Sequence, residues 1–121
     1  MKTNIRVDLI PPTYRRAVLT EPLWFNDARI PSGFYTDFAS VPRLFWRILP
    51  PLDRYTPAAI VHDYRYYTNG LTRKQADAEF YRNARDLNTP LWQAAMLYLG
   101  VRIGGWVAWN KYRRDRGKVK G

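Results

Sequence analysis

Residues 55–87 read YTPAAIVHDYRYYTNGLTRKQADAEFYRNARDL, and this stretch decides the fold of the chain. Thr56 stands where a helix N-cap belongs, and Pro57 follows at the first helical position. Asn69 and Gly70 are expected to end this helix, because glycine tolerates the left-handed conformation that often follows a helix. The first helix of a pair is therefore predicted between these two signals.

A second helix is predicted to begin at Thr72, because Thr72 and Gln75 have the spacing of a capping box. Its apolar residues recur at intervals of four, four and three, which places them on one helix face that packs against a core. They are Ala76, Phe80, Ala84 and Leu87. Since a short turn joins the two helices, we expect them to pack antiparallel.

The residues before this helix pair indicate β-structure. The segments IRVDL at 5–9 and RAVLT at 16–20 have the character of short strands. A further strand is expected to enter a Pro-Ser-Gly turn at 31–33 and to return through Phe34 and Tyr35. The predicted class is α+β, with an N-terminal β-hairpin packed on the antiparallel helix pair and a third, apolar C-terminal helix.

The third helix is expected at residues 91–109, LWQAAMLYLGVRIGGWVAW, a segment that approaches the length of a membrane span. Gln93, Arg102 and three glycines argue against spanning. An arginine near the centre of a bilayer costs about 2.5–3.5 kcal/mol on insertion scales. A buried helix whose glycines allow close packing is therefore expected, and a helix that lies on a bilayer surface is the alternative.

Length and charge limit the classes of protein. The 121 residues suit a single domain, predicted at 1–110, followed by a basic tail at 111–121 that is expected to be solvated and disordered. Twenty Lys and Arg against ten Asp and Glu give a net charge of +10, which favours nucleic acid, phospholipid headgroups or an acidic protein as partner. The absence of cysteine excludes disulfides and a cysteine nucleophile, and the N-terminus lacks the apolar stretch of a secretory signal.

One group of residues has the composition of a catalytic site. His62, the only histidine, lies four residues before Tyr66, so the two share a helix face, whereas Asp63 projects about 100° away. In an antiparallel pair, Asp77 of the second helix approaches His62. Asp77 and Tyr66 would then fix the imidazole tautomer, and the other ring nitrogen would face a water as general base. Asp63 would bind a hard cation together with loop carbonyl oxygens.

The motifs H-D-x-x-Y at 62–66 and A-D-x-x-F at 76–80 resemble the catalytic helix pair of secreted-type phospholipase A2. They are most similar to the compact versions found in parvovirus capsid proteins. The resemblance implies that His62 activates water, that Asp63 binds calcium and that Asp77 orients the histidine.

The upstream sequence departs from these enzymes, which bind calcium through a Gly-rich loop just before the histidine. Residues 33–51, GFYTDFASVPRLFWRILPP, contain one glycine, Gly33, far from His62. Asp37 is the candidate for an additional carboxylate ligand. The alternative for Asp37 is an Asx turn or helix cap.

Three blocks, SGFYTDFASVPRLFW, AAIVHDYRYY and RKQADAEFYRNA, resemble in order the domain of unknown function family 1353. They lie within residues 32–84. The resemblance implies a small protein encoded by a tailed phage or prophage, in the virion or in the cytoplasm of the infected bacterium. It does not supply an activity.

These observations leave three hypotheses. The first is a calcium-assisted, phospholipase-A2-like lipid ester hydrolase that acts at a phospholipid surface, has His62 as its base and requires an open cleft there. The second is a non-enzymatic virion or tail-associated protein that meets other phage structural proteins, in which His62 and Asp77 only join two helices. The third is nonspecific nucleic-acid binding through the basic surface.

Overall fold

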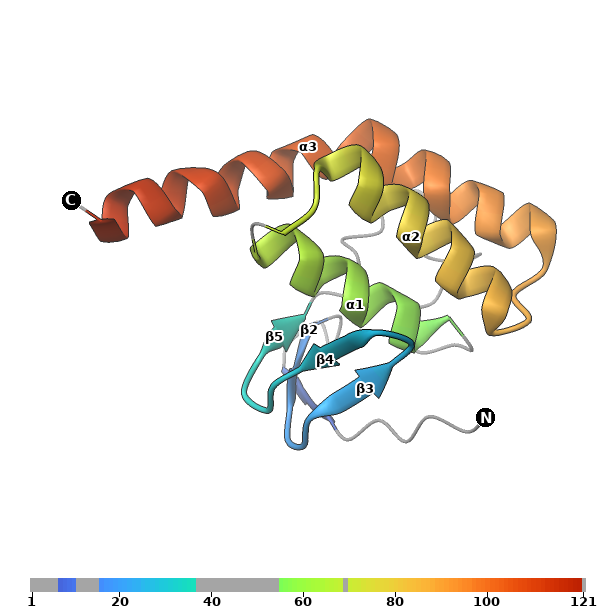
Figure 1. The fold of residues 1–121 in the computed structure, drawn as a ribbon, viewed down its shortest axis with the longest axis horizontal. Coiled ribbons are helices and arrows are strands. Elements are labelled where there is room, and N and C mark those ends of the chain that lie inside the picture. Colours follow the sequence, from blue (N-terminus) through green and yellow to red (C-terminus); the bar gives the residue numbers. More distant parts are fainter. Residues whose placement is uncertain (1–6, 11–15, 37–54, 69, 121) are drawn as a thin grey trace.

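The computed structural model describes residues 7–10, 16–36, 55–68 and 70–120, which form five strands followed by three helices. The strands are β1 (Val7–Ile10), β2 (Arg16–Leu19), β3 (Leu23–Phe25), β4 (Ala28–Ile30) and β5 (Tyr35–Thr36). The helices are α1 (Thr56–Tyr67), α2 (Arg73–Asp86) and α3 (Leu91–Lys120). The strands lie on one side of α1, and α2 and α3 on the other (Figure 1). This arrangement confirms the predicted α+β class and its antiparallel helix pair.

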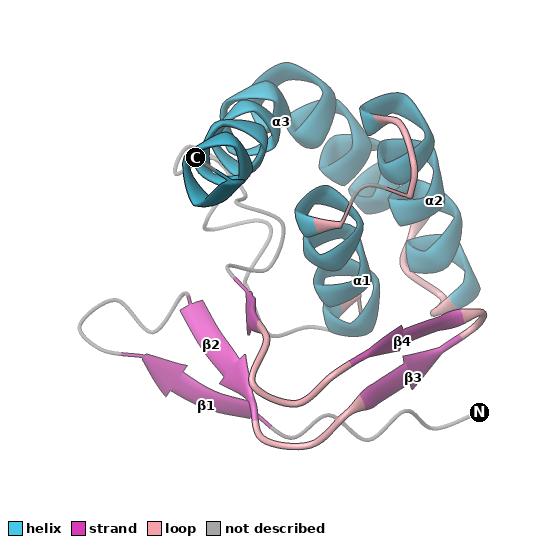
Figure 2. Ribbon diagram, turned by 60° about the vertical axis from the view of Figure 1, so that its left-hand side comes forward, coloured by secondary structure: helices cyan, strands magenta, loops and turns pink. Residues whose placement is uncertain are grey.

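The strands form two small antiparallel sheets on the same side of α1 (Figure 2). One sheet has the order β1-β2-β5, and Val18 of β2 lies opposite Tyr35 of β5. The other is the hairpin β3-β4, in which Phe25 lies opposite Ala28. Buried and exposed residues alternate along β3 and β4, as expected for strands with one face on a core.

The predicted turn at 31–33 is present and leads into β5, but the strands before and after it do not pair with each other, so it is not the turn of a hairpin. The tight turn lies earlier, at Asn26 and Asp27, where Asn26 adopts a left-handed φ of 51° that asparagine tolerates. Gly33, with a φ of 87°, instead leads the chain from β4 towards β5, and its N–H donates to the Leu19 carbonyl at 2.7 Å. The chain that returns through Tyr35 therefore pairs with β2 rather than with the strand directly before it.

The two ends of α1 also differ from the prediction. The N-cap is Tyr55, which makes no side-chain capping bond, and Thr56 is a buried residue inside the first turn with Pro57. The helix ends at Tyr67, and the C-cap Thr68 has extended backbone angles. Gly70 does not adopt a positive φ, so it does not form the left-handed cap expected of it.

The predicted start and inner face of α2 are confirmed. The Thr72 hydroxyl accepts from the Gln75 N–H at 3.1 Å, and the Gln75 side chain accepts from the Thr72 N–H at 2.9 Å. These two bonds satisfy backbone donors that a helix start leaves without partners. Residues Ala76, Phe80 and Ala84 are buried, and Leu87 packs partly buried against the core.

Helix α3 runs much further than predicted. It continues to Lys120, so the expectation of a disordered tail over 111–120 is wrong. The Arg113 guanidinium donates to the Tyr66 carbonyl at 2.8 Å and lies 3.6 Å from the centroid of the Trp109 ring. The hydrogen bond to the Tyr66 carbonyl attaches the start of the basic segment to α1. Positive side chains near the C-terminal end of a helix also stabilise it through the helix dipole. In the part of the chain that the structure describes, no helix is long and apolar enough to span a membrane.

Candidate functional site

The three side chains expected to meet do so in the buried space between the helices. The Nε2 atom of His62 lies 2.7 Å from Oδ1 of Asp77. The Tyr66 hydroxyl donates to the same oxygen at 2.6 Å. Asp77 is fully buried and His62 is 2% exposed. The spacing of four residues on α1 and the short turn before α2 are enough to bring these groups together.

Aromatic packing fixes the orientation of the imidazole. The centroid of the His62 ring lies 4.2 Å from that of Tyr66 on its own helix. It also lies 4.8 Å from the centroid of Phe80 on α2. Since ring contacts of this kind restrict rotation, the hydrogen bond to Asp77 is held in one geometry.

The second oxygen of Asp77 belongs to a different set of contacts. Its Oδ2 accepts from Arg102 of α3 at 2.8 Å and lies 3.5 Å from Nη1 of Arg73 on α2. Arg73 also donates to the carbonyls of Val101 and Arg102, at 3.1 and 3.3 Å. One carboxylate therefore joins all three helices, and we call Asp77 with His62, Tyr66, Arg73 and Arg102 the Asp77 cluster.

The cluster keeps Asp77 ionised. Burial by itself raises the pKa of this carboxyl, but hydrogen bonds from His62, Tyr66 and Arg102 outweigh it and lower the pKa below its ordinary value. Burial and the hydrogen bond to Asp77 raise the pKa of Tyr66 well above its ordinary value, so the phenol stays neutral and donates.

The two nitrogens of His62 therefore have different roles. An ionised Asp77 only accepts hydrogen bonds, so the Nε2 atom carries the proton that is shared with it. When the ring is neutral, its lone pair lies on Nδ1, which is 4.0 Å from Oδ1 of Asp63. Among the described residues, Nδ1 has no hydrogen-bond partner. A neutral imidazole held through one nitrogen, with the other free to accept, is the form required of a general base.

The expectation that this second nitrogen faces water is wrong for the structure described. The ring is enclosed: 2% of the residue's surface is exposed, and the Tyr66 and Phe80 rings pack against it. The backbone of Gly105 on α3 comes so close that a Cβ atom there would lie 2.5 Å from the Tyr66 hydroxyl. The arrangement of the predicted residues is present, but the open cleft is not.

Asp63 lies beside the ring and faces the strands. It is buried, and it accepts a hydrogen bond from the Thr36 hydroxyl of β5. Asp37, the other expected cation ligand, lies outside the described residues. Within those residues, no three His, Cys, Asp or Glu side chains come together as a metal site. Calcium takes 6–8 oxygen ligands, so Asp63 and Thr36 do not form a calcium site by themselves.

Two residues of the cluster were missed from the sequence, although each carried a signal. Arg73 precedes Asp77 by four residues, a spacing typical of a helical ion pair. Arg102 is a charge within an otherwise apolar segment, and a charge in such a segment usually has a buried partner. That the partner is Asp77 depends on the packing of α3, which the sequence pattern does not define.

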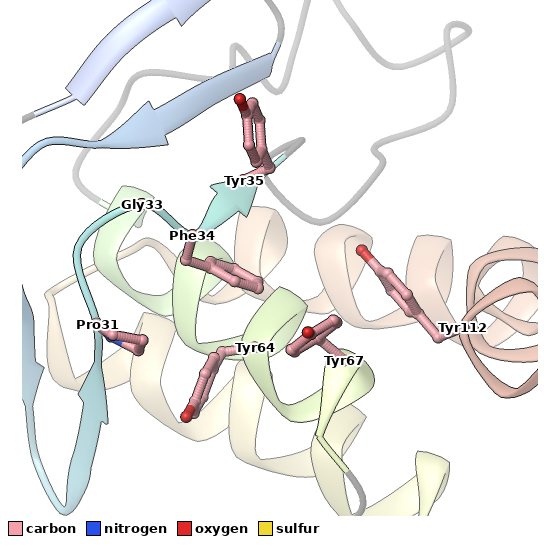
Figure 3. Close-up of a pocket in the computed structure, with 7 residues that line it drawn as sticks. All are labelled: Pro31, Gly33, Phe34, Tyr35, Tyr64, Tyr67 and Tyr112. Atoms are coloured by element: carbon pink, nitrogen blue, oxygen red, sulfur yellow. The ribbon is translucent and has the colours of Figure 1, made fainter. Parts of the chain in front are cut away.

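An aromatic pocket of about 410 Å³ lies on the other side of α1. Its walls include Phe34, Tyr64 and Tyr67, whose rings meet edge to face at centroid distances of 5.4 and 5.7 Å (Figure 3). Tyr112 of α3 completes this side at 5.9 Å from Tyr67. No member of the Asp77 cluster lines the pocket, although Tyr64 is the neighbour of Asp63 in sequence.

Comparison with known protein families identifies the family of the chain. The profile of the family described as protein of unknown function (DUF1353) matches residues 17–101. The chain belongs to the DUF1353 family. This confirms the resemblance inferred from the sequence, whereas origin in a phage stays a prediction. The matched region contains His62, Asp63, Tyr66 and Asp77 and ends just before Arg102.

Part of the chain is similar to part of a longer protein. The uncharacterized protein y4jT of Sinorhizobium fredii (strain NBRC 101917 / NGR234) is 33% identical to the chain over 78 residues. These residues are 63% of this chain and 23% of the relative, so the chain matches about a quarter of that protein's length. No solved structure shows a significant match.

Proposed function

We propose that this DUF1353 protein hydrolyses acyl esters, with phospholipids as the substrate class and His62 as the general base. The observation that carries the proposal is the difference between the two nitrogens of His62. Nε2 binds the ionised, fully buried Asp77, while the buried Nδ1 has no partner among the described residues. A buried polar atom without a partner costs about 1–3 kcal/mol, which a purely structural histidine has no reason to bear.

The reaction assigns one role to each side chain. His62 Nδ1 takes a proton from water as the oxygen attacks the ester carbonyl, and returns it to the leaving alcohol when the tetrahedral intermediate collapses. The products are a carboxylic acid and an alcohol. Asp77 stabilises the imidazolium that forms, and Tyr66 holds Asp77 in place. Water and substrate must reach Nδ1, so an opening of the enclosed site is part of the proposal.

Fatty-acid release from phospholipid vesicles tests this function. We expect release by the full chain and a loss of at least about 100-fold in His62→Gln, since a general base contributes about 10²–10⁴-fold. Glutamine still offers an N–H to Asp77 but has no basic nitrogen. Tyr64→Phe, on the same helix but outside the cluster, is the matched control and should retain activity.

Calcium and a chelator are compared in the same assay, because Asp63 is the proposed carboxylate for a cation. Loss of release in the chelator would assign the cation to the reaction, whereas equal release would leave His62 acting without it. The hydrolase is disproved if the full chain releases no fatty acid under either condition, or if His62→Gln remains active.

A non-enzymatic scaffold is the second candidate, and the enclosed ring favours it. In this case His62 and Asp77 serve only to join α1 to α2 and α3. The scaffold predicts no release by any variant, and a lower melting temperature as the main effect of His62→Gln.

A further inference from the structure

Helix α3 exposes large apolar side chains on the face turned away from the molecule. Each of six such residues is between 55% and 74% exposed. They are Leu91, Trp92, Leu99, Ile103, Trp106 and Val107. At 100° per residue, all but Leu91 fall within an arc of about 100°, and we call these five the outer stripe. The buried residues Ala94, Leu97 and Val101 lie on the opposite side of the helix.

The outer stripe is unusual for a surface helix. A helix that packs through one face normally presents polar residues on the other. Here the apolar side chains continue from Trp92 to Val107, about 22 Å at 1.5 Å per residue. Contiguous exposed apolar surface of this kind marks an interaction site.

Positive charge follows the outer stripe along the same helix. Lys111 and Arg114 are exposed in the turns after Val107. The last eleven residues contain six Lys or Arg and one Asp, and the whole chain carries +10. Because the structure continues α3 to Lys120, this charge lies along the same helix as the apolar stripe rather than in a separate tail.

We propose that the outer stripe of α3 binds to the surface of an anionic phospholipid bilayer, with the helix lying in the interface. An apolar helix face beside Lys and Arg has the composition of interfacial helices. Trp92 and Trp106 stand near its two ends, and tryptophan favours the headgroup region. The positive charge also decides against a second copy of the chain, since two molecules of +10 would repel each other.

An acidic protein would satisfy the charge but fits the stripe less well. Protein partners are usually recognised through anchor residues that enter pockets, together with specific hydrogen bonds. The outer stripe instead offers aliphatic and indole side chains along one straight helix. A bilayer needs no such matching features, so lipid is the partner proposed. The binding does not depend on hydrolysis at His62.

Co-sedimentation of the full chain with vesicles tests the proposal. We expect binding to vesicles of equal parts phosphatidylcholine and phosphatidylglycerol, and at least tenfold weaker binding to phosphatidylcholine alone. The double variant Ile103→Gln, Trp106→Gln should lower the affinity for the anionic vesicles at least tenfold. Trp24→Gln is the control, because Trp24 is an exposed tryptophan on β3, outside the outer stripe.

Each other result decides against the stripe as a lipid site. Unchanged vesicle binding by the double variant would show that positive charge alone causes the binding. Such charge would bind any polyanion, including nucleic acid. A dimer in sedimentation that the double variant abolishes, without vesicle binding, would assign the stripe to a second copy. No binding of the full chain to anionic vesicles would also overturn the proposal. His62→Gln should bind like the unchanged chain, so loss of activity and loss of binding are measured separately.

Discussion

The carboxylate of Asp77 binds side chains from all three helices. One oxygen accepts from His62 and Tyr66, and the other accepts from Arg102. A fully buried charge is tolerated only when it is paired and hydrogen-bonded. The stability of the helices and the orientation of the imidazole therefore depend on the same side chain.

Asp77→Asn should destabilise the protein by about 3 kcal/mol or more, because it leaves Arg102 facing a neutral group in a mostly buried position. Urea unfolding measures the change in the free energy of unfolding. Asp86→Asn, an exposed site on the same helix, should change it by no more than about 0.5 kcal/mol. Equal stability of the two variants would mean that the charge of Asp77 does not hold the helices.

At the scale of single residues, the sequence predicted the contacts that depend on local geometry. His62 and Tyr66 share a helix face because they are four residues apart, and the short turn after α1 brings Asp77 of α2 to that face. The enclosure of the ring was not predictable, since it depends on the tertiary packing around the imidazole. The contact of Arg102 with Asp77 has the same origin, because it joins residues on helices whose packing is set by the whole core.

At the scale of elements, the two-residue capping box of α2 was a reliable signal, whereas the single capping residues expected at the two ends of α1 were not. The Thr72–Gln75 capping box predicted the start of α2 correctly, because both bonds are formed within one turn of the chain. The strands were harder to predict, since Asn26-Asp27 and Pro31-Ser32-Gly33 both have the composition of turns. The pairing of β5 with β2 is not local, so a search for neighbouring strands could not find it.

The approach of α3 to α1 depends on Gly105. Gly105→Ala should destabilise the protein by about 1–2 kcal/mol, because the new Cβ atom would lie 2.5 Å from the Tyr66 hydroxyl. The better helix propensity of alanine offsets part of this loss. Thermal unfolding is the measurement. Gly70→Ala is the control, since nothing lies within 4 Å of a Cβ atom at that position.

A second substitution shows whether the clash is the cause. Tyr66→Phe removes the hydroxyl, so Gly105→Ala should cost about 1 kcal/mol less in the Tyr66→Phe background. Additive effects of the two substitutions would mean that the loss at Gly105 has another origin.

At the scale of the whole molecule, the pKa of Asp77 predicts a dependence of stability on pH. The folded pKa lies below the ordinary value of 3.8, so the unfolded chain binds the proton first as the pH falls. The contribution of Asp77 is thus complete above about pH 4 and is lost as the pH falls through the lower folded value.

The stability difference between the unchanged chain and Asp77→Asn should therefore be constant near neutral pH and shrink below about pH 4. Chemical unfolding at a series of pH values measures it. The other carboxylates titrate in both proteins, so their effects cancel. A difference that stays constant into strong acid would show that folding does not lower the pKa of Asp77.

The composition predicts the net charge of the molecule, but it does not show that the basic C-terminal residues belong to a helix. Residues 111–121 have the composition of a disordered tail, yet α3 continues to Lys120. The contact of Arg113 with the Tyr66 carbonyl joins positions 47 residues apart, which no local pattern indicates.

Asp77 both orients the imidazole and holds the three helices together. Because this carboxylate stabilises the fold whether or not the site is catalytic, its presence in a relative is no sign of an active enzyme. The proposed hydrolysis places a further demand on the histidine opposite it, because glutamine can donate to the same oxygen but cannot act as a base. If the proposed hydrolysis at His62 is correct, a relative that has lost this activity should keep the aspartate and replace the histidine.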